Sequence, residues 1–399
     1  MHYRVVLFQQ YLRQFVLNFG KCLKEGEFVS ETPPPPRTLY KELPTFENEM
    51  QRVKKHWRYW LRAIVGIPNI RIRFEKKGDL LFTYGTLLIT NKPYCVYLET
   101  GLSLYNYSLG IGKNPIARLL VSLLAIQKNC HRLIFLSEAG KKSFFASLWY
   151  PKPVRDILAK KMEVVYPVPL PEIHPLPPKQ FSGELKLLLA GAYYMKGGME
   201  MIQAFERLRK QYSNCSLTIL TPVHTMREED VDYVRSIPGV TLLDATLGAD
   251  EMRALYRDHH IFCLPTYRDG FGLVLIEALA YGMPLIITDQ YATSEMLAEG
   301  ENGFLFRNHP LQDYDPATYQ ILGRYYNPRD FYRDLFHFKT EGKFKPVEDF
   351  IYQSVEQFLL HPELVEQFSH RSLELYRQKF HPQVIGNQLE NIFQSALKR

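Results

Sequence analysis

Two carboxylates, Asp269 and Glu277, flank a glycine-containing turn that follows an apolar run over residues 261–264. The run predicts a buried strand, and Gly270 and Gly272 after it allow backbone amides to approach a ligand closely. In open α/β sheets, ligands bind where such strands end. Carboxylates at this place are suited to accept hydrogen bonds from sugar hydroxyls.

A helix is expected to follow this turn, from about Leu273 to Tyr281. Gly282 stands where a left-handed C-cap is favoured, and Pro284 prevents the helix from continuing. The free N–H groups and the positive dipole end at the start of such a helix attract phosphate. The turn therefore predicts a phosphate site next to the two carboxylates.

A second turn of the same kind runs from Gly191 to Gly198 and carries one lysine, Lys196. This turn also follows a predicted strand, over residues 185–190, and precedes a predicted helix, over residues 199–209. A lysine at this place can supply a positive charge to a diphosphate. Together the two turns predict a diphosphate ligand bound between two lobes of the protein.

Alternating strands and helices must position these turns. After residue 184, short apolar runs recur about every 20–30 residues with helix-like stretches between them, which predicts βαβ units and a parallel sheet. The first half repeats the theme less clearly. The expected strands lie over residues 80–84, 94–98, 133–136 and 164–167 in the first half, and over 185–190, 216–221, 240–243, 261–264 and 285–288 in the second.

A proline cluster near the middle of the chain separates the two halves. Six prolines fall between Pro167 and Pro178, a density that neither a helix nor a central strand tolerates. We therefore predict an α/β fold with two Rossmann-like, doubly wound domains, over residues 1–178 and 179–380. A C-terminal helix over residues 381–399 is expected to pack back on the first domain.

Two further stretches carry expectations about packing. Apolar residues with the spacing i, i+3, i+4 predict a helix that faces the core in the first domain. These residues are Ile116, Leu119, Leu120, Leu123 and Leu124. Between residues 306 and 346 the alternation of strands and helices fails, which predicts an irregular aromatic insert, and residues 347–399 are again typical of helices.

The stretch from Pro265 to Pro284 resembles the signature of retaining glycosyltransferases of family 4. That signature is a strand, Pro-Ser, a short loop, Glu-Gly-Phe-Gly, a second glutamate and Ala-x-x-x-Gly-x-Pro. Downstream, Glu295 and residues 302–305 fit its continuation, and upstream the Lys-Gly-Gly at 196–198 fits the Lys-Gly that grips the donor pyrophosphate. The resemblance implies the GT-B architecture, in which two Rossmann-like domains face a central cleft.

The resemblance also implies a role for each matching residue. Asp269, at the position of the first glutamate, would read hydroxyls of the transferred sugar, and Glu277 would bind the ribose of the nucleotide. Lys196 would neutralise the leaving diphosphate, so that no metal ion or cofactor is required. The other donor-binding positions implied are Gly191, Gly197, Gly270, Phe271, Gly272 and Leu273.

The implied reaction moves a hexose from a UDP- or GDP-sugar to a hydroxyl of a saccharide or glycolipid acceptor, in polysaccharide biosynthesis. The expected chemistry is front-face displacement with retention at the anomeric carbon, and the leaving phosphate oxygen serves as the base. The domain over residues 179–380 would hold the nucleotide sugar, and the domain over residues 1–178 would face the acceptor. Glu99, at the end of a predicted strand, is the nearest candidate for an acceptor-side group.

Three positions depart from the family pattern. Asp269 is one methylene shorter than the usual glutamate, the arginine that precedes the lysine in the family is missing, and Tyr-Ala at residues 291–292 replaces Gly-Gly. These departures keep open a second hypothesis, that of a catalytically silent GT-B protein that binds a nucleotide sugar or a protein partner. A hydrolase or phosphorylase-like enzyme ranks lower, because no separate general acid is visible.

Simpler structural interpretations also stay open for single residues. Asp269 fits an N-cap or a loop carboxylate, and Lys196 fits a solvated lysine at a helix start. Glu295 fits a first-turn glutamate favoured by the dipole of its helix, and Glu99 fits a solvated carboxylate. The Asp-Tyr-Asp at residues 313–315 looks like a metal motif, but without a preceding strand it predicts a surface turn.

Composition narrows the class of protein. The chain has 399 residues, a net charge of +7 and five dispersed cysteines without metal-ligand or redox spacing. A disulfide framework and a cysteine zinc site are therefore not expected. No run of about 18 apolar residues and no signal-peptide pattern is present, so we expect a cytoplasmic protein, at most peripheral at the inner face of a membrane.

The stretch over residues 54–62 is basic with interleaved aromatic residues. Such a stretch suits an anionic membrane surface, a nucleic acid or a structural helix with its aromatic side chains turned inward. We expect peripheral membrane contact here and no nucleic-acid partner. Transfer onto DNA would need a localised basic groove and salt-sensitive binding.

Overall fold

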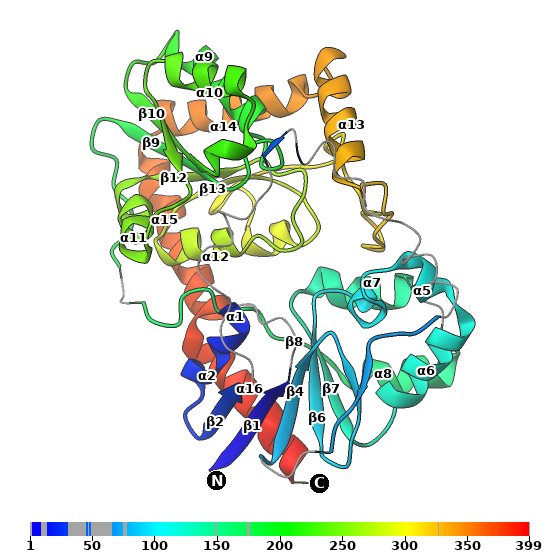
Figure 1. The fold of residues 1–399 in the computed structure, drawn as a ribbon. Coiled ribbons are helices and arrows are strands. Elements are labelled where there is room, and N and C mark those ends of the chain that lie inside the picture. Colours follow the sequence, from blue (N-terminus) through cyan, green and yellow to red (C-terminus); the bar gives the residue numbers. More distant parts are fainter. Residues whose placement is uncertain are drawn as a thin grey trace.

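A computed structural model of the chain describes residues 2–8, 14–30, 45, 46, 48, 66–74, 78–147, 150–173, 176–325 and 327–398. Two parallel sheets with helices packed around them follow one another along the chain (Figure 1). The predicted α/β fold with two Rossmann-like, doubly wound domains is confirmed. The basic stretch at 54–62 lies outside the described residues.

The N-terminal sheet has the strand order β2-β1-β4-β6-β7-β8, with all neighbours parallel. Its central strand β6 is buried along its whole length, as expected of a parallel sheet covered on both faces. A short parallel pair, β3 and β5, stands apart from it. The strands are β1 Tyr3–Phe8, β2 Gly26–Ser30, β3 Ile70–Ile72, β4 Leu80–Tyr84, β5 Leu87–Ile89, β6 Tyr94–Leu98, β7 Cys130–Phe135 and β8 Met162–Val164.

The last strand of this domain differs from the expectation. β8 ends at Val164, whereas a strand was expected over residues 164–167. The amide of Val165 still bonds to the carbonyl of Phe135, at 3.0 Å. Pro167 has no N–H to continue the ladder, so the chain leaves the sheet there.

The C-terminal sheet has the order β11-β10-β9-β12-β13-β14, again with parallel neighbours. Counted along the chain this is the order 3-2-1-4-5-6 of the dinucleotide-binding fold, whose direction of winding changes between its first and fourth strands. Here those strands are β9 and β12. The strands are β9 Leu185–Ala190, β10 Cys215–Thr221, β11 Val240–Asp244, β12 Ile261–Leu264, β13 Leu285–Thr288 and β14 Gly303–Phe306.

Helices connect the strands and extend the chain beyond β14, as predicted for residues 347–399. In the N-terminal domain they are α1 Gln14–Leu17, α2 Phe19–Cys22, η1 Gly101–Tyr105, α5 Leu109–Lys113, α6 Pro115–Ala125, α7 Glu138–Ser147 and α8 Lys152–Ala159. The later ones are α9 Gly198–Arg209, η2 Val223–Thr225, α10 Glu228–Ser236, α11 Ala249–Asp258, α12 Leu273–Ala280, η3 Thr293–Met296, α13 Pro328–Thr340, α14 Lys345–Leu360, α15 Glu363–Leu375, η4 Tyr376–Phe380 and α16 Pro382–Leu397. No described helix combines the length and apolarity that crossing a bilayer requires.

Helix α6 forms where it was predicted, but the prediction of its buried face is wrong. Four of the five residues expected in the core are exposed, and of these five only Leu124 is buried. The core-facing side is instead built from Ala117, Val121, Leu124 and Ala125. This helix is apolar on two sides, and periodicity alone cannot tell which side meets the sheet.

The expected irregular insert is only partly irregular. Residues 307–325 consist mainly of turns, but residues 328–340 form helix α13, so the expectation is wrong for this part. Phe331, Tyr332 and Leu335 of α13 are buried. Their spacing of one and four residues places them on one side of a helix, which explains why so aromatic a stretch packs regularly.

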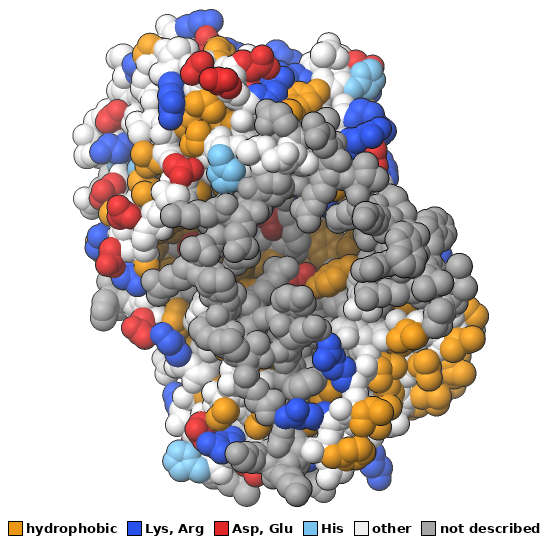
Figure 2. Space-filling model, in the orientation of Figure 1, with side chains coloured by type: hydrophobic (Ala, Val, Ile, Leu, Met, Phe, Trp, Pro, Cys, Tyr) orange, Lys and Arg blue, Asp and Glu red, His pale blue; other side chains and the backbone are white. Residues whose placement is uncertain are grey.

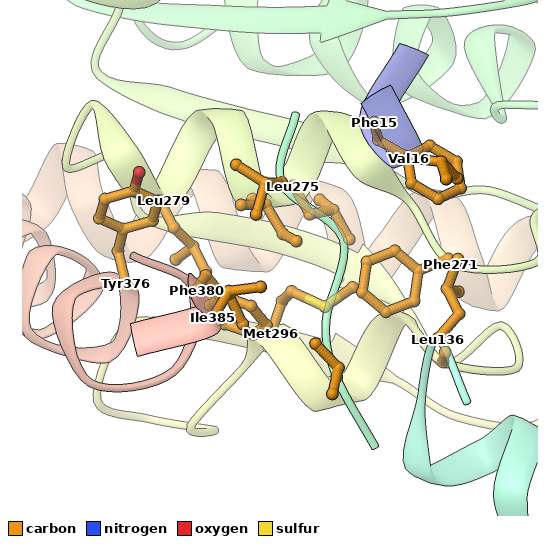
Figure 3. Packing of buried hydrophobic residues seen from close by; sticks show 14 of the residues in the cluster. Phe15, Val16, Leu136, Phe271, Leu275, Leu279, Met296, Tyr376, Phe380 and Ile385 are labelled. Carbon is orange, nitrogen blue, oxygen red and sulfur yellow. The ribbon is translucent and has the colours of Figure 1, made fainter. Parts of the chain in front are cut away.

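The last helix crosses from the C-terminal domain to the N-terminal one. α16 packs against α2 and β4, and Figure 1 shows it running down to the first sheet. Gly386 lies so close to α2 that a Cβ there would be 2.1 Å from the carbonyl oxygen of Cys22. One buried cluster joins both domains: Figure 3 shows Phe271 and Leu275 together with Leu136 and with Phe380 of η4.

Candidate donor-binding site

The two predicted turns lie side by side at the centre of the C-terminal sheet. The turn over residues 191–197 follows β9, the turn over residues 265–272 follows β12, and these two strands pair directly. This is the point where the winding direction of the sheet changes, and both turns leave the carboxyl ends of their strands. Ligands of open α/β folds bind at such a point. The topology therefore brings together the two motifs that the sequence singled out.

Close backbone contacts hold the two turns together. The amide of Tyr267 donates to the carbonyl of Met195 at 2.9 Å, and the Thr266 hydroxyl donates to the same oxygen at 3.2 Å. Gly197 has φ +71°, and a Cβ there would be 2.2 Å from the carbonyl oxygen of Pro265. Gly197 is therefore needed both for its backbone angle and for the close approach of the turns.

Lys196 and Asp269 form an ion pair across the two turns. The Lys196 Nζ contacts Oδ2 of Asp269 and also donates to the carbonyl of Arg268 at 3.2 Å. The side chains are 16% and 17% exposed, so the pair is largely removed from water. Gly191 makes room for the lysine, because a Cβ there would be 2.9 Å from Cγ of Lys196.

The second oxygen of Asp269 closes the turn just before helix α12. Oδ1 accepts hydrogen bonds from the amides of Phe271, at 3.0 Å, and Gly272, at 2.8 Å. Burial would raise the pKa of Asp269, but the Lys196 ammonium and these two amides outweigh it, so the pKa lies below its usual value. Both amides precede the first residue of α12, whose N-cap is Gly272, so the geometry is that of the loop carboxylate which the sequence left open as a simpler interpretation.

The rest of the glycine turn presents backbone rather than side chains. Gly270 is exposed, and a Cβ there would meet no atom within 4 Å. Gly272 precedes α12, and Leu273, half-buried, is the first residue of that helix. The Phe271 side chain turns away from the turn into the cluster between the domains, 6.1 Å from the Tyr166 ring. Only its amide faces the site.

Glu277 lies one turn into α12 and has a partner from the neighbouring helix α11. The hydroxyl of Tyr256 donates to Oε2 of Glu277 at 2.6 Å, and the Tyr256 ring stacks on Tyr281. Burial raises the pKa of Glu277. The carboxylate is therefore oriented by the protein before any ligand arrives.

Glu99 lies in the N-terminal domain, one residue after β6. Its carboxylate accepts hydrogen bonds from the hydroxyl of Tyr107, at 2.9 Å, and from that of Tyr84. It is thus a partnered carboxylate rather than a solvated one. The charge of Glu99 adds to burial in raising the pKa of Tyr291 in the opposite domain, so this group is close to the interface between the domains.

Glu295 makes a contact between the domains that sequence reasoning missed. Its carboxylate accepts the amides of Glu138, at 2.9 Å, and Ala139, at 2.8 Å, which open helix α7 of the N-terminal domain. The Tyr166 hydroxyl donates to it at 2.9 Å. Burial raises the pKa of Glu295. The sequence analysis left open that Glu295 is favoured by the dipole of its own helix. The dipole that favours it is instead that of α7, in the other domain.

Tyr291 makes a second contact between the domains. It has φ +58°, a left-handed angle that is uncommon for a residue other than glycine. Its hydroxyl donates to the Ser143 hydroxyl of α7 at 2.8 Å. The family pattern has glycine at this position, which could have indicated a left-handed backbone angle. Nothing in the sequence indicated where the tyrosine ring would lie.

The described residues contain no group of three histidine, cysteine or acidic side chains arranged to hold a metal ion. Asp313 and Asp315 accept amides of their own loop instead, from Arg324 at 2.8 Å and from Thr318 at 2.8 Å. The interpretation of the Asp-Tyr-Asp motif as a turn is therefore confirmed.

Residues 184–322 match the family model of the group 1 glycosyl transferases. The chain is 24% identical over 206 residues to the capsular polysaccharide biosynthesis glycosyltransferase CapM of Staphylococcus aureus, an alignment that covers 51% of this chain and 44% of that protein. It is 28% identical over 158 residues to the D-inositol 3-phosphate glycosyltransferase of an Arthrobacter strain, covering 36% and 38%. The alignments thus span less than half of these relatives.

Solved structures resemble the chain over its whole length. Anabaena HepE, solved in complex with UDP and glucose, superposes with a TM-score of 0.55 at 12% identity and covers 99% of this chain and 100% of its own. A glycosyltransferase of Rickettsia africae gives a TM-score of 0.56 at 10% identity, covering 100% and 99%. These likenesses show the fold, which is GT-B.

Proposed function

We propose that this protein is a glycosyltransferase. Its residues 184–322 match the group 1 glycosyl transferase family model, and its fold is GT-B. It moves a hexose from a UDP- or GDP-sugar to a hydroxyl of a saccharide or glycolipid acceptor. The observation that carries the proposal is the Lys196–Asp269 pair, at the point where the sheet changes direction and at the start of α12. A cation beside a helix N-terminus is suited to a diphosphate.

The diphosphate would bind against Lys196 and the first amides of α12. The described residues take two of the three ammonium donors of Lys196, through Asp269 and the Arg268 carbonyl. The third donor is left for a phosphate oxygen. The dipole of α12 adds to this charge at the same place. Two sources of positive charge would thus hold the diphosphate and its developing charge as the sugar leaves.

The sugar and the ribose would be read by the two carboxylates. Asp269 sits directly beside Lys196, where the first hexose hydroxyls beyond the diphosphate would lie. Glu277, already held by Tyr256, would accept hydrogen bonds from the ribose. Binding of the donor would draw Lys196 toward the phosphate and release Oδ2 of Asp269 for a sugar hydroxyl.

The transfer would proceed on one face of the sugar, without a metal ion. The bond between the anomeric carbon and the β-phosphate oxygen breaks, and the acceptor oxygen bonds to the same carbon from the same face. The acceptor proton passes to the leaving phosphate oxygen. Lys196 supplies the charge that stabilises this leaving group. The configuration at the anomeric carbon is retained because the acceptor bonds on the face that the leaving group occupied.

The acceptor would enter from the N-terminal domain. Glu99 and its partner Tyr107 offer an oriented carboxylate and a hydroxyl at the carboxyl end of β6. Such groups bind the hydroxyls of a saccharide. The naming of CapM as a capsular polysaccharide enzyme supports a role of this kind in building a polysaccharide or glycolipid.

The test is release of UDP or GDP from UDP- and GDP-hexoses, in EDTA, with and without saccharide and glycolipid acceptors. We expect one donor series to be consumed when an acceptor is present, and the anomeric proton of the product to show retention by NMR. Donor binding without turnover on any acceptor would favour a silent nucleotide-sugar-binding protein, in which Asp269 only stabilises the turn before α12. Absence of nucleotide binding would contradict the proposal.

A further inference from the structure

Helix α6 presents an apolar face to solvent. Ile116 is 63% exposed, Leu119 58% and Leu123 49%, and Leu120 is exposed as well. These four residues recur at the spacing of one helix face, opposite the face that packs on the sheet. A row of large exposed apolar side chains of this kind marks an interaction site on a protein.

The short strand pair β3 and β5 lies next to α6 and carries further exposed apolar residues. β5 packs against α6, and the side-chain amide of Asn129, just after α6, donates to the carbonyl of Thr90 at 2.7 Å. Ile72 of β3 pairs in register with Ile89 of β5, and both are exposed. Phe74 follows β3 and is 67% exposed.

We call this the α6–β3 surface. It comprises Ile72, Phe74, Ile89, Ile116, Leu119, Leu120 and Leu123. Figure 2 shows hydrophobic side chains gathered along the edge of the molecule where Figure 1 places α6. The surface belongs to the N-terminal domain and is built from residues that the proposed donor site does not use.

Positive charges border this surface. Lys113 lies just before α6 and Lys128 just after it, and both are exposed. The sequence has no aspartate or glutamate from residue 100 to residue 137, a stretch that includes the whole of α6. Any partner of this surface therefore meets apolar side chains together with cations.

An anionic lipid bilayer is the partner that fits both properties. Apolar side chains enter the boundary of the acyl chains, while the lysines at their edge meet the negatively charged headgroups. A second copy of this chain would bring the same cations face to face, which is unfavourable. A nucleic acid would satisfy the cations but would leave the leucines and isoleucines without an apolar partner.

We propose that the α6–β3 surface docks this protein on an anionic membrane. The helix lies along the bilayer, and its four exposed apolar residues are buried among the lipids. This contact also places the N-terminal domain, where the acceptor would enter, next to the lipid surface.

The test is co-sedimentation of the full chain with vesicles of phosphatidylcholine, with and without phosphatidylglycerol. We expect binding to the vesicles that contain phosphatidylglycerol, and about a tenfold or larger loss of binding in Leu119→Gln/Leu123→Gln. The matched control is Leu360→Gln, because Leu360 is 55% exposed at the end of α14 in the other domain. An unchanged melting temperature in each variant shows that the fold is intact.

Charge is tested separately. Lys113→Gln/Lys128→Gln should weaken binding to the anionic vesicles, and the exposed pair Lys210→Gln/Lys379→Gln should not. Lys196→Ala should bind vesicles as the wild type does, so failure of the docking proposal and failure of the proposed function are distinguishable. Wild-type protein that stays in the supernatant, or a double leucine variant that binds normally, would overturn the proposal. A wild-type dimer that the leucine substitutions dissociate would also overturn it.

Discussion

At the scale of single residues, Asp269 links charge and structure at the proposed site. One oxygen pairs with Lys196, and the other accepts two amides at the start of α12. The aspartate at this position is one methylene shorter than the glutamate of the family pattern, and this keeps the carboxylate close to its own loop. The same residue therefore closes the turn before α12 and also pairs with the lysine.

Substitution of Asp269 separates these two contributions. Asp269→Asn keeps an oxygen for the amides of Phe271 and Gly272 but removes the charge, whereas Asp269→Ala removes both. We expect Ala to lower the free energy of unfolding by about 1 kcal/mol more than Asn does, because the hydrogen bonds to the two turn amides are lost. Urea denaturation measures this difference. Equal stability of the two variants would show that these hydrogen bonds contribute nothing.

Glu200 is a buried carboxyl at the start of α9. Because of it, we expect the stability of the folded protein to depend on pH. Glu200 is 1% exposed, Oε2 has no partner among the described residues, and burial raises its pKa from 4.5 to about 7. The folded protein then binds more protons than the unfolded chain between these values, so stability falls as pH rises from 4.5 to 7. Glu200→Gln should abolish this pH-dependent loss of unfolding free energy, which amounts to at most about 3 kcal/mol.

Denaturation at pH 5 and pH 8 tests this prediction. We expect Glu200→Gln to be more stable than the wild type at pH 8 and to differ much less at pH 5. The comparison variant is Glu348→Gln. Burial also raises the pKa of Glu348, but this side chain is more exposed than that of Glu200. The same slope of stability against pH in wild type and Glu200→Gln would rule out this group as the cause.

Among the candidate site residues, the sequence could indicate those that a local pattern marks. Lys196, Asp269 and Glu277 are candidates because glycines and an apolar run mark a strand, a turn and a helix around them. The partner of Glu295 could not be found, because it is the start of a helix more than a hundred residues away. A first-turn glutamate looks the same in sequence whichever helix it caps.

At the scale of elements, the close contact between the turns after β9 and β12 sets the geometry of the site. Gly197→Ala would place a Cβ 2.2 Å from the Pro265 carbonyl oxygen at a left-handed backbone angle. We expect it to lower the free energy of unfolding by about 2 kcal/mol or more and to weaken nucleotide binding. Gly270→Ala is the matched control, because a Cβ there meets nothing within 4 Å.

Chemical denaturation and a nucleotide titration of both glycine variants give the comparison. The Gly270→Ala variant should stay within about 0.5 kcal/mol of the wild type, as is usual for an exposed position. If Gly197→Ala were equally harmless, the two turns would not need their close approach.

Element positions could largely be predicted, while the faces they present could not. The strands of the C-terminal sheet are short apolar runs because both faces of a parallel sheet are covered, and such runs are visible in sequence. Helix α6 is apolar on both sides, so its spacing predicted the wrong buried face. Contacts with the sheet decide which face of α6 is buried. The smaller side chains Ala117, Val121 and Ala125 fit against the sheet.

At the scale of the whole molecule, Glu295 and Tyr291 join the two domains on one side of the proposed site. Glu295→Ala removes three hydrogen bonds to the N-terminal domain, including two from the start of α7. Hydrogen bonds to a charged group contribute about 1.5–3 kcal/mol each. We expect the domains of this variant to separate more easily, which small-angle X-ray scattering would detect as a larger radius of gyration.

The control for this prediction is Glu299→Ala. Glu299 pairs with Arg307 of its own domain on the surface, at 2.8 Å. Its variant should scatter as the wild type does. Identical scattering of the Glu295→Ala variant and the wild type would mean that the buried cluster around Phe271, together with α16, holds the domains by itself.

Binding of a nucleoside diphosphate at Lys196 tests the proposed function most directly. UDP and GDP are titrated in EDTA into the wild type, Lys196→Ala and the exposed control Lys210→Ala. We predict that one nucleotide binds the wild type and Lys210→Ala equally, and binds Lys196→Ala about tenfold to a hundredfold more weakly. No binding to the wild type, or unchanged binding to Lys196→Ala, would contradict a donor site at this pair of turns.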